Sequence, residues 1–302
     1  MIYAIRLYCI YISVGSTLLV LTGWAMREPL NVERVTDTDS TLFYFRRLHI
    51  ARESADKTKV MNRDDFLKIE RLYHFTNRCS ALKILETGSL KFGKLKQMND
   101  INESYREVFT KEGVEPEKVE EELNKYKQIS LTHDGRLLGF AIPSMWGHYA
   151  EKGYGICFVF DKTKLLNTIS GDCYGDDIHY SFDYDNSIKI DKDDIESSFK
   201  ENIKDLFFTK TIDWEYEQEF RIITKSSNDV MEYKDSLMAI IMYFAEDIPN
   251  NKSAYDSTMA KLIRKIAPNL SILELGYWDG EPNLRNGDEQ WYPITNNYEL
   301  DV

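Results

Sequence analysis

The segment DWEYEQEFRII, residues 213–223, alternates charged and apolar side chains along most of its length. Glu215, Glu217 and Glu219 occupy alternate positions, and Arg221 occupies the next alternate position. Because successive side chains of a strand point to opposite faces, this pattern predicts a half-buried β-strand with three carboxylates on one face. Like charges in a row repel one another and add nothing to a core. The row therefore indicates either a solvated strand face or a functional site.

The segments around residues 213–223 predict many short strands with helices inserted between them. Strand patterns cover residues 71–76, 89–93, 128–132, 154–161, 176–184, 236–247 and 270–278. Helix patterns cover residues 78–87, 113–127, 142–153, 191–208 and 253–267. Asn77 can cap the first of these helices, and Gly88 stands where it would stop. Strands and helices do not alternate regularly, so the sequence predicts an α+β fold built mainly on antiparallel strands.

Composition limits the classes of partner. The chain has 302 residues, of which 43% are hydrophobic, enough for one large core or two modest ones. Its formal net charge of -12 argues against broad electrostatic attraction to nucleic acid or to anionic membranes, although a local basic groove stays open. The scattered cysteines are Cys9, Cys79, Cys157 and Cys173. They form no CxxC pair and have no histidine at ligand spacing, so we expect free thiols in a reducing compartment and no metal site.

The first 25 residues differ in composition from the rest of the chain. Residues 7–25 carry no charge, over a length at which a membrane helix becomes plausible. Three interpretations stay open: a membrane anchor, a signal peptide cut after Ala25, or upstream sequence included by an early start. Residues 26–60 are polar and predict a linker, and residues 61–302 predict a single globular domain. Basic residues after the apolar stretch predict a cytoplasmic domain, with membrane contact only through that stretch.

Three short motifs hold candidate ligand-binding residues. His74 lies in the first predicted strand, where a histidine is more often structural than functional. The segment MWGHYA, residues 145–150, is either a core anchor or a stacking wall for a ring ligand. The segment MNDINES, residues 98–104, is typical of a helix cap or a polar turn. The sequence contains no glycine-rich Rossmann or P-loop motif, and no GxSxG or HExxH motif.

These segments occur together and in order: LYHFT, MNDINE, MWGHYAEKGYGICFVFD and WEYEQEFRI. The series strongly resembles a bacterial family of uncharacterised proteins with the pattern YHxT, NDPxE, MWxHYAxxxxGICxxFD and WxYExEWR. The resemblance spans residues 71–223 and continues more weakly to about Tyr277. Ile101 stands where the pattern has proline, and Phe220 stands where it has tryptophan. Membership of this family implies no function.

The same order of residues looks, more distantly, like ADP-ribosyltransferases of the DNA-modifying toxin type. In that superfamily a first-strand histidine or arginine holds the adenosine side of NAD, an aromatic ring stacks on nicotinamide, and a strand glutamate acts on the ribose. The resemblance implies a compact split-sheet core, NAD as substrate, a toxin or phage-defence role, and a protein or nucleic-acid acceptor that the sequence does not identify. It implies Glu219, Glu217 and Tyr149 as catalytic residues. The implied NAD-binding residues are His74, Thr76, Asn99, Trp146, His148 and Arg221.

The chemistry of that reaction offers a role for the glutamates at alternate positions of residues 215–219. Cleavage of the nicotinamide–ribose bond builds positive charge on the sugar, which a fixed carboxylate stabilises. A second carboxylate about 7 Å along the strand can accept the proton of the nucleophile. We expect Arg221 to keep Glu219 ionised, and Glu217 to bind a proton more readily. This enzyme hypothesis predicts that His74, Tyr149 and Glu219 converge on one pocket. The competing hypothesis, a non-catalytic module that binds a partner through this charged and aromatic surface, predicts that they lie apart.

Overall fold

A computed structural model describes residues 10–14, 17–21, 63–95, 115–169, 171, 173–182, 188, 190–243, 257–278, 281–286 and 289–291. The chain divides into two compact units, Met1–Lys57 and Thr58–Val302. In the first unit, strands β1 (Ile10–Val14) and β2 (Thr17–Leu21) form an antiparallel hairpin. Within the described residues, we find no helix that is both long and apolar enough to span a membrane. The predicted linker, residues 26–60, lies outside them.

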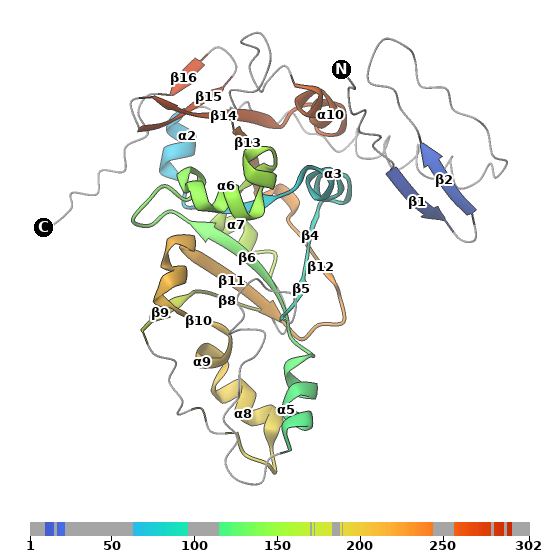
Figure 1. The fold of residues 1–302 in the computed structure, drawn as a ribbon, viewed down its shortest axis with the longest axis vertical. Coiled ribbons are helices and arrows are strands. Elements are labelled where there is room, and N and C mark those ends of the chain that lie inside the picture. The colour runs from blue at the N-terminus through green and yellow to red at the C-terminus, as the bar shows by residue number, and fades with distance from the viewer. Residues whose placement is uncertain are drawn as a thin grey trace, which may run out of the picture. The chain divides into compact units, whose positions relative to one another are not determined.

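The second unit is built around one large sheet (Figure 1). Across the sheet its strands are β16 (Glu289–Trp291), β15 (Glu281–Asn286), β14 (Ser271–Trp278), β13 (Leu237–Tyr243), β7 (Ile156–Asp161), β3 (Arg71–Thr76), β6 (Lys127–His133), β11 (Glu219–Thr224) and β8 (Cys173–Asp177), with β5 (Gly93–Lys94) also paired to β6. Strands β13 and β14 run parallel, and the other neighbouring pairs are antiparallel. This mixed, mostly antiparallel sheet with interspersed helices confirms the predicted α+β fold class.

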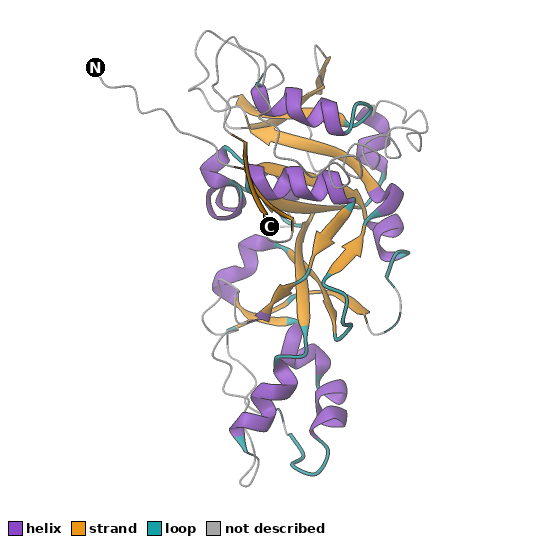
Figure 2. Cartoon of the chain, turned by 90° about the vertical axis from the view of Figure 1, so that its right-hand side faces the viewer, coloured by secondary structure: helices purple, strands orange, loops and turns teal. Residues whose placement is uncertain are grey.

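Helices lie on both sides of the strands (Figure 2). The α-helices are α2 (Arg63–Lys68), α3 (Arg78–Thr87), α5 (Pro116–Leu123), α6 (Pro143–Tyr149), α7 (Lys162–Leu166), α8 (Ile195–Glu201), α9 (Ile203–Phe207) and α10 (Thr258–Ile266). The 3-10 helices are η2 (Gly139–Ala141), η3 (Glu151–Gly153), η4 (Ile212–Glu217) and η5 (Lys234–Ser236). The remaining strands pair in twos, β4 (Ser89–Lys91) with β12 (Val230–Glu232) and β9 (His179–Ser181) with β10 (Thr209–Thr211).

Helix α3 forms with the boundaries that the sequence predicts. The Asn77 side chain accepts a hydrogen bond of 2.8 Å from the Ser80 amide, which satisfies a free donor of the first turn. Gly88 ends the helix in the left-handed conformation, with φ 65°, where glycine carries no steric penalty. Local signals therefore fix both ends of this helix.

Alternate residues of the central strands fill two cores on opposite faces of the large sheet. On one face, Leu72 and Phe158 pack with side chains from α3, α7 and α10 in what we call the first core. On the other face, Tyr73 packs with Trp146 and other residues of α6 and η2 in the second core. A third core joins α5, α8 and α9 to β11 around Phe207. Burial on both faces explains why strand β7, with the sequence ICFVFD, is apolar almost throughout.

The large sheet opens between β3 and β6. Strand β3 pairs with β7 along its whole length, but with β6 only through Leu72–His133 and Tyr73–Thr132. Strand β6 pairs fully with β11 instead. The ladder between β3 and β6 therefore stops just before His74, and the two halves of the sheet separate there.

Residues 213–223 do not form the single strand that their alternation predicts. Residues Ile212–Glu217 form the 3-10 helix η4, and Gln218 then takes the left-handed conformation, with φ 44° and ψ 52°. Only Glu219–Thr224 form strand β11. A left-handed residue cannot continue a strand, so Gln218 separates the two elements.

The prediction of three glutamates on one strand face is consequently wrong. Glu215 is exposed on the 3-10 helix, whereas Glu217 and Glu219 are 4% and 2% exposed. The cause is a tertiary contact, because both buried carboxylates bind Lys210 from strand β10. Such contacts override the local preference for a strand.

Candidate functional site

Four charged side chains form a buried network beside the start of β11. The Nζ of Lys210 lies 2.7 Å from Oε2 of Glu217 and 2.7 Å from Oε2 of Glu219. Arg221 binds Glu219 through Nε (2.8 Å to Oε1) and Nη2 (2.9 Å to Oε2), and it also donates to the carbonyl of Phe207. We call Lys210, Glu217, Glu219 and Arg221 the carboxylate network. Each of the four is at most 5% exposed, and two carboxylates balance two cations, as buried charges require.

One end of the carboxylate network reaches the protein surface through a tyrosine. The Tyr149 hydroxyl, at the end of α6, donates a hydrogen bond of 2.5 Å to Oε1 of Glu217. The Tyr149 side chain is half-buried, and the neighbouring His148 is exposed. Glu217 thus contacts a partly accessible group.

Further aromatic rings adjoin Tyr149. The His148 ring lies 6.2 Å from the Tyr149 ring and 6.4 Å from the Tyr216 ring, measured between centroids. Trp214 lies 6.1 Å from Tyr216, and the Lys210 ammonium lies 5.2 Å from the Trp214 centroid. We call His148, Tyr149, Trp214 and Tyr216 the aromatic rim. Rings arranged in this way offer faces on which a planar ligand can stack.

The two buried glutamates have pKa values shifted in opposite directions. Burial alone would raise the pKa of Glu219, but the charges and hydrogen bonds of Arg221 and Lys210 outweigh burial and lower it to about 2. For Glu217, burial outweighs Lys210, the charge of Glu219 adds to the effect, and the pKa rises above its usual range. Both directions confirm the predictions from the sequence. The largest cause of the Glu217 shift is burial rather than the neighbouring glutamates.

His74 and Glu219 do not face the same side of the sheet. His74 pairs with Phe158 of β7, which belongs to the first core. Glu219 pairs with Thr132 of β6, and Thr132 pairs with Tyr73 of the second core. Directly paired residues point to the same face, so His74 and Glu219 point to opposite faces. Their backbones are two strands apart, or about 10 Å, so the separation permits a shared ligand but the orientation does not favour one.

The His74 ring contacts the strand across the opening of the sheet. Its Nδ1 lies 3.3 Å from the carbonyl oxygen of Ser130 in β6. Burial outweighs this hydrogen bond and lowers the pKa of His74, which favours the neutral ring. Thr76 follows on the same strand and is buried. The predicted NAD-binding residues of β3 therefore lie at the opening, and no described contact joins them to the carboxylate network.

The other predicted NAD-binding residues are distributed among core, network and surface. Trp146 is buried in the second core, where its Nε1 donates 2.7 Å to the carbonyl of Phe140 and its ring packs edge-on against Phe75. Arg221 belongs to the carboxylate network, and His148 lies on the aromatic rim. Asn99 lies outside the described residues. In the described part of the chain, no three His, Cys, Asp or Glu side chains are grouped to hold a metal ion.

Lys210, the residue that joins the two glutamates, was not predicted from the sequence. It stands between two threonines in strand β10, which lies next to β9 in a short parallel pair. The available signal was a single charged residue among the apolar and threonine residues of 206–212, because buried lysines require a carboxylate partner. That signal identifies a buried ion pair but does not identify the partners.

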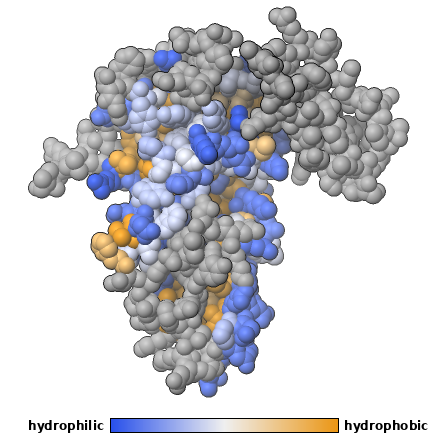
Figure 3. Space-filling view, viewed as in Figure 1, coloured by the Kyte–Doolittle hydropathy of each residue, from blue (hydrophilic) through white to orange (hydrophobic). Residues whose placement is uncertain are grey.

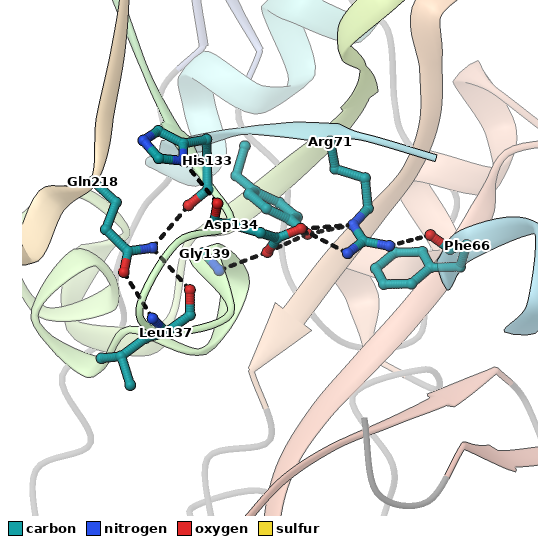
Figure 4. A network of polar contacts seen from close by, with 8 residues as sticks. Phe66, Arg71, His133, Asp134, Leu137, Gly139 and Gln218 are labelled. Atoms are coloured by element: carbon teal, nitrogen blue, oxygen red, sulfur yellow. Dashed lines mark hydrogen bonds and ion pairs between the residues drawn. The ribbon is translucent and has the colours of Figure 1, made fainter. Parts of the chain in front are cut away.

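A second polar network, also missed, fixes the loop between β6 and η2 (Figure 4). The Asp134 carboxylate accepts hydrogen bonds from Arg71 (2.6 Å from Nη2), from the Tyr73 hydroxyl (3.0 Å) and from the Gly139 amide (2.8 Å). Arg71 also donates to the carbonyl of Phe66. Asp134 thereby ties the loop to strand β3 and to the segment that leads into α6.

Comparison with known proteins identifies one family within the chain. A family model described as "Protein of unknown function (DUF2971)" matches residues 145–222. No curated protein and no solved structure matches the chain. The match includes the aromatic rim and the whole carboxylate network, and it confirms that part of this chain carries a domain of unknown function. The comparisons show no link to ADP-ribosyltransferases.

Proposed function

We propose that this chain splits NAD at the bond between nicotinamide and ribose and passes the ADP-ribose to water or to an acceptor. The observation that carries the proposal is the pair of buried glutamates with opposite pKa shifts, one of them bonded to the half-buried Tyr149. Environments that separate the pKa values of neighbouring carboxyls assign different acid–base roles to them. The sequence resemblance to ADP-ribosyltransferases supplies NAD as the substrate.

In the proposed step the bond between C1′ of the ribose and the nicotinamide nitrogen breaks, and nicotinamide leaves with the electron pair. The ribose carries the positive charge until an oxygen nucleophile bonds to C1′. The nucleophile loses its proton to the Glu217 carboxylate, whose raised pKa makes it a stronger base than an ordinary carboxylate. Tyr149 orients that carboxylate. Glu219 is 2% exposed and acts through Lys210, which binds both glutamates.

A non-catalytic binding module is the second candidate. The observation that favours it is the placement of His74, which faces away from Glu219 and binds the Ser130 carbonyl. A module would use the aromatic rim as its contact surface. On the face seen in Figure 3, the described hydrophobic residues form separate patches among hydrophilic ones. Such scattered patches are ordinary for a protein surface, so they give this candidate little further support.

The experiment that separates the candidates follows labelled NAD in the presence of cell lysate. We expect the protein to release nicotinamide and to transfer label to protein or nucleic acid. Glu217→Gln should lower the transfer of label to the acceptor by about 10²-fold or more, by analogy with the loss of other proton-accepting groups. Glu215→Gln is the matched control, since Glu215 is exposed on the same 3-10 helix. Release of nicotinamide no faster than in a heat-denatured sample would refute the enzyme proposal and favour the module.

A further inference from the structure

Gln218 adopts a backbone conformation that a glutamine rarely takes. Its φ of 44° lies in the left-handed region, which favours glycine and asparagine. The residue is also buried, at 8% exposure, between two elements that both belong to the candidate site. Residues held in such backbone conformations persist where surrounding contacts fix the backbone, and they often lie at functional sites.

The Gln218 carboxamide is fully bonded to one loop. Its Nε2 donates to the carbonyls of His133 (2.9 Å) and Leu137 (2.8 Å), and its Oε1 accepts from the Leu137 amide at 2.7 Å. Figure 4 shows these bonds on one side of the loop and the Arg71–Asp134 contacts on the other. The loop is therefore held from both sides, by strand β3 and by the residue between Glu217 and Glu219.

Both partners of the Tyr149–Glu217 hydrogen bond depend on this loop. Tyr149 follows it along the chain through η2 and α6, and the Asp134 carboxylate fixes the Gly139 amide at the start of η2. Glu217 is attached to it through the adjacent Gln218. We propose that Gln218 is a positioning residue, which fixes Glu217 to the β6–η2 loop so that its carboxylate meets Tyr149. This role concerns the geometry of the site and does not depend on which reaction the site performs.

The test measures the site directly rather than its activity. In Gln218→Gly the left-handed backbone is retained and the carboxamide is removed. We expect exchange of the Leu137 amide to become at least about tenfold faster, as for loss of one hydrogen bond. We also expect the Tyr149–Glu217 hydrogen bond to weaken, so the pKa of Glu217, followed by carboxyl NMR, should rise, because that bond lowers it in the parent. The groups facing Glu217 are Tyr149 of α6, Lys210 of β10 and Glu219 of β11. The variant substitutes none of these residues.

Two further variants and a control make the result decisive. Gly135→Ala perturbs the same contact from the loop side, because an added Cβ would meet Cδ of Gln218 at 3.0 Å. It should shift the pKa of Glu217 in the same direction by a smaller amount. Gln218→Met keeps a side chain of similar length but loses both donors and the acceptor, and should behave like the glycine variant. Lys234→Gly is the control, since it relieves an exposed left-handed residue elsewhere.

The positioning role is overturned if the folded Gln218 variants keep the parent's Leu137 exchange and Glu217 pKa, even when they unfold more easily. It is equally overturned if Gln218→Met behaves like the parent. Lys234→Gly should leave both readouts unchanged, and a matching shift in that control would assign the effect to general loosening of the fold. Nicotinamide release is measured separately, so failure of the proposed reaction leaves these outcomes intact.

Discussion

The Tyr149 hydroxyl donates a hydrogen bond of 2.5 Å to Glu217 across 68 positions of sequence. It joins the end of helix α6 to the end of η4 and connects the buried network to a half-buried side chain. The bond stabilises the ionised form of Glu217 and therefore lowers its pKa, against the larger effect of burial.

Tyr149→Phe should raise the pKa of Glu217 further, because the donor is lost while the carboxyl stays buried. Carboxyl NMR across a pH titration measures this shift. Tyr154→Phe is a suitable control, since Tyr154 is 47% exposed and lies in a separate turn. A pKa that falls or stays constant in Tyr149→Phe would contradict the assigned contact.

Glu219→Gln should destabilise the fold more than Glu215→Gln. Removal of the Glu219 charge leaves Arg221 and Lys210 buried with one carboxylate between them, and breaking a buried pair costs about 3–5 kcal/mol. Glu215 is exposed, so its substitution should change the free energy of unfolding by less than about 0.5 kcal/mol. Urea unfolding measures both.

A double variant checks the cause of that loss. Glu219→Gln combined with Arg221→Met removes one charge of each sign, so the buried network is again neutral. We expect it to recover part of the stability lost in Glu219→Gln. A double variant less stable than the sum of the two single changes would show that packing, rather than the uncompensated charge, dominates.

Stability should also fall in acid because of Glu219. Its folded pKa of about 2 lies below the value of 4.5 for an unperturbed glutamate, so the folded state binds this proton less tightly than the unfolded state. The contribution is therefore fully present above about pH 4.5 and is lost as the pH falls toward 2. Thermal melting in this range should drop more steeply for the parent than for Glu219→Gln. Parallel curves would contradict the depressed pKa.

Elements whose ends are set by local capping residues or by an apolar run were predicted correctly from the sequence. Asn77 and Gly88 fixed helix α3, and the apolar run of β7 fixed a buried strand. Residues 213–217 were mispredicted because their alternation fits a strand, whereas the contacts of Glu217 and Glu219 with Lys210 arise only in the folded chain. The left-handed Gln218, which separates helix from strand, leaves no mark in a single sequence, since glutamine rarely adopts that conformation.

The candidate site was predictable only in part for a related reason. Glu217, Glu219, Arg221 and Tyr149 lie in motifs, and their types and order suggested a shared site. The side of the sheet to which His74 points depends on how β3 pairs with β6 and β7. These strands are far apart in the sequence, so no local pattern encodes their register. Lys210 likewise meets its partners only through the fold.

A chain beginning at Met61 should fold without the preceding residues. The compact unit that contains the large sheet begins at Thr58, close to the boundary that composition predicts. We expect the shortened protein to be soluble and to unfold at the same urea concentration as the full chain. A product found only as insoluble aggregate would contradict this boundary.

Lys210→Met tests the centre of the carboxylate network. The ammonium lies 2.7 Å from both carboxylates, and without it two buried glutamates would share the single charge of Arg221. Arg221 binds Glu219 through two hydrogen bonds, so Glu217 is the group that must take up a proton. The pKa of Glu217 should rise further, because the charge of Lys210 lowers it in the parent.

When the pKa of a carboxyl is higher in the folded state than in the unfolded state, the carboxyl stabilises the fold at pH values below its unfolded pKa. This stabilisation is lost as the pH rises through the folded pKa. Lys210→Met should therefore lose stability as the pH rises above the ordinary glutamate value of 4.5, and more steeply than the parent does. Urea unfolding from pH 5 to 8 measures the slope. Lys118→Met is the control, because Lys118 pairs with Glu115 on an exposed helix face. If the free energy of unfolding changed with pH equally in Lys210→Met and Lys118→Met, Lys210 would not be the residue that lowers the pKa of Glu217.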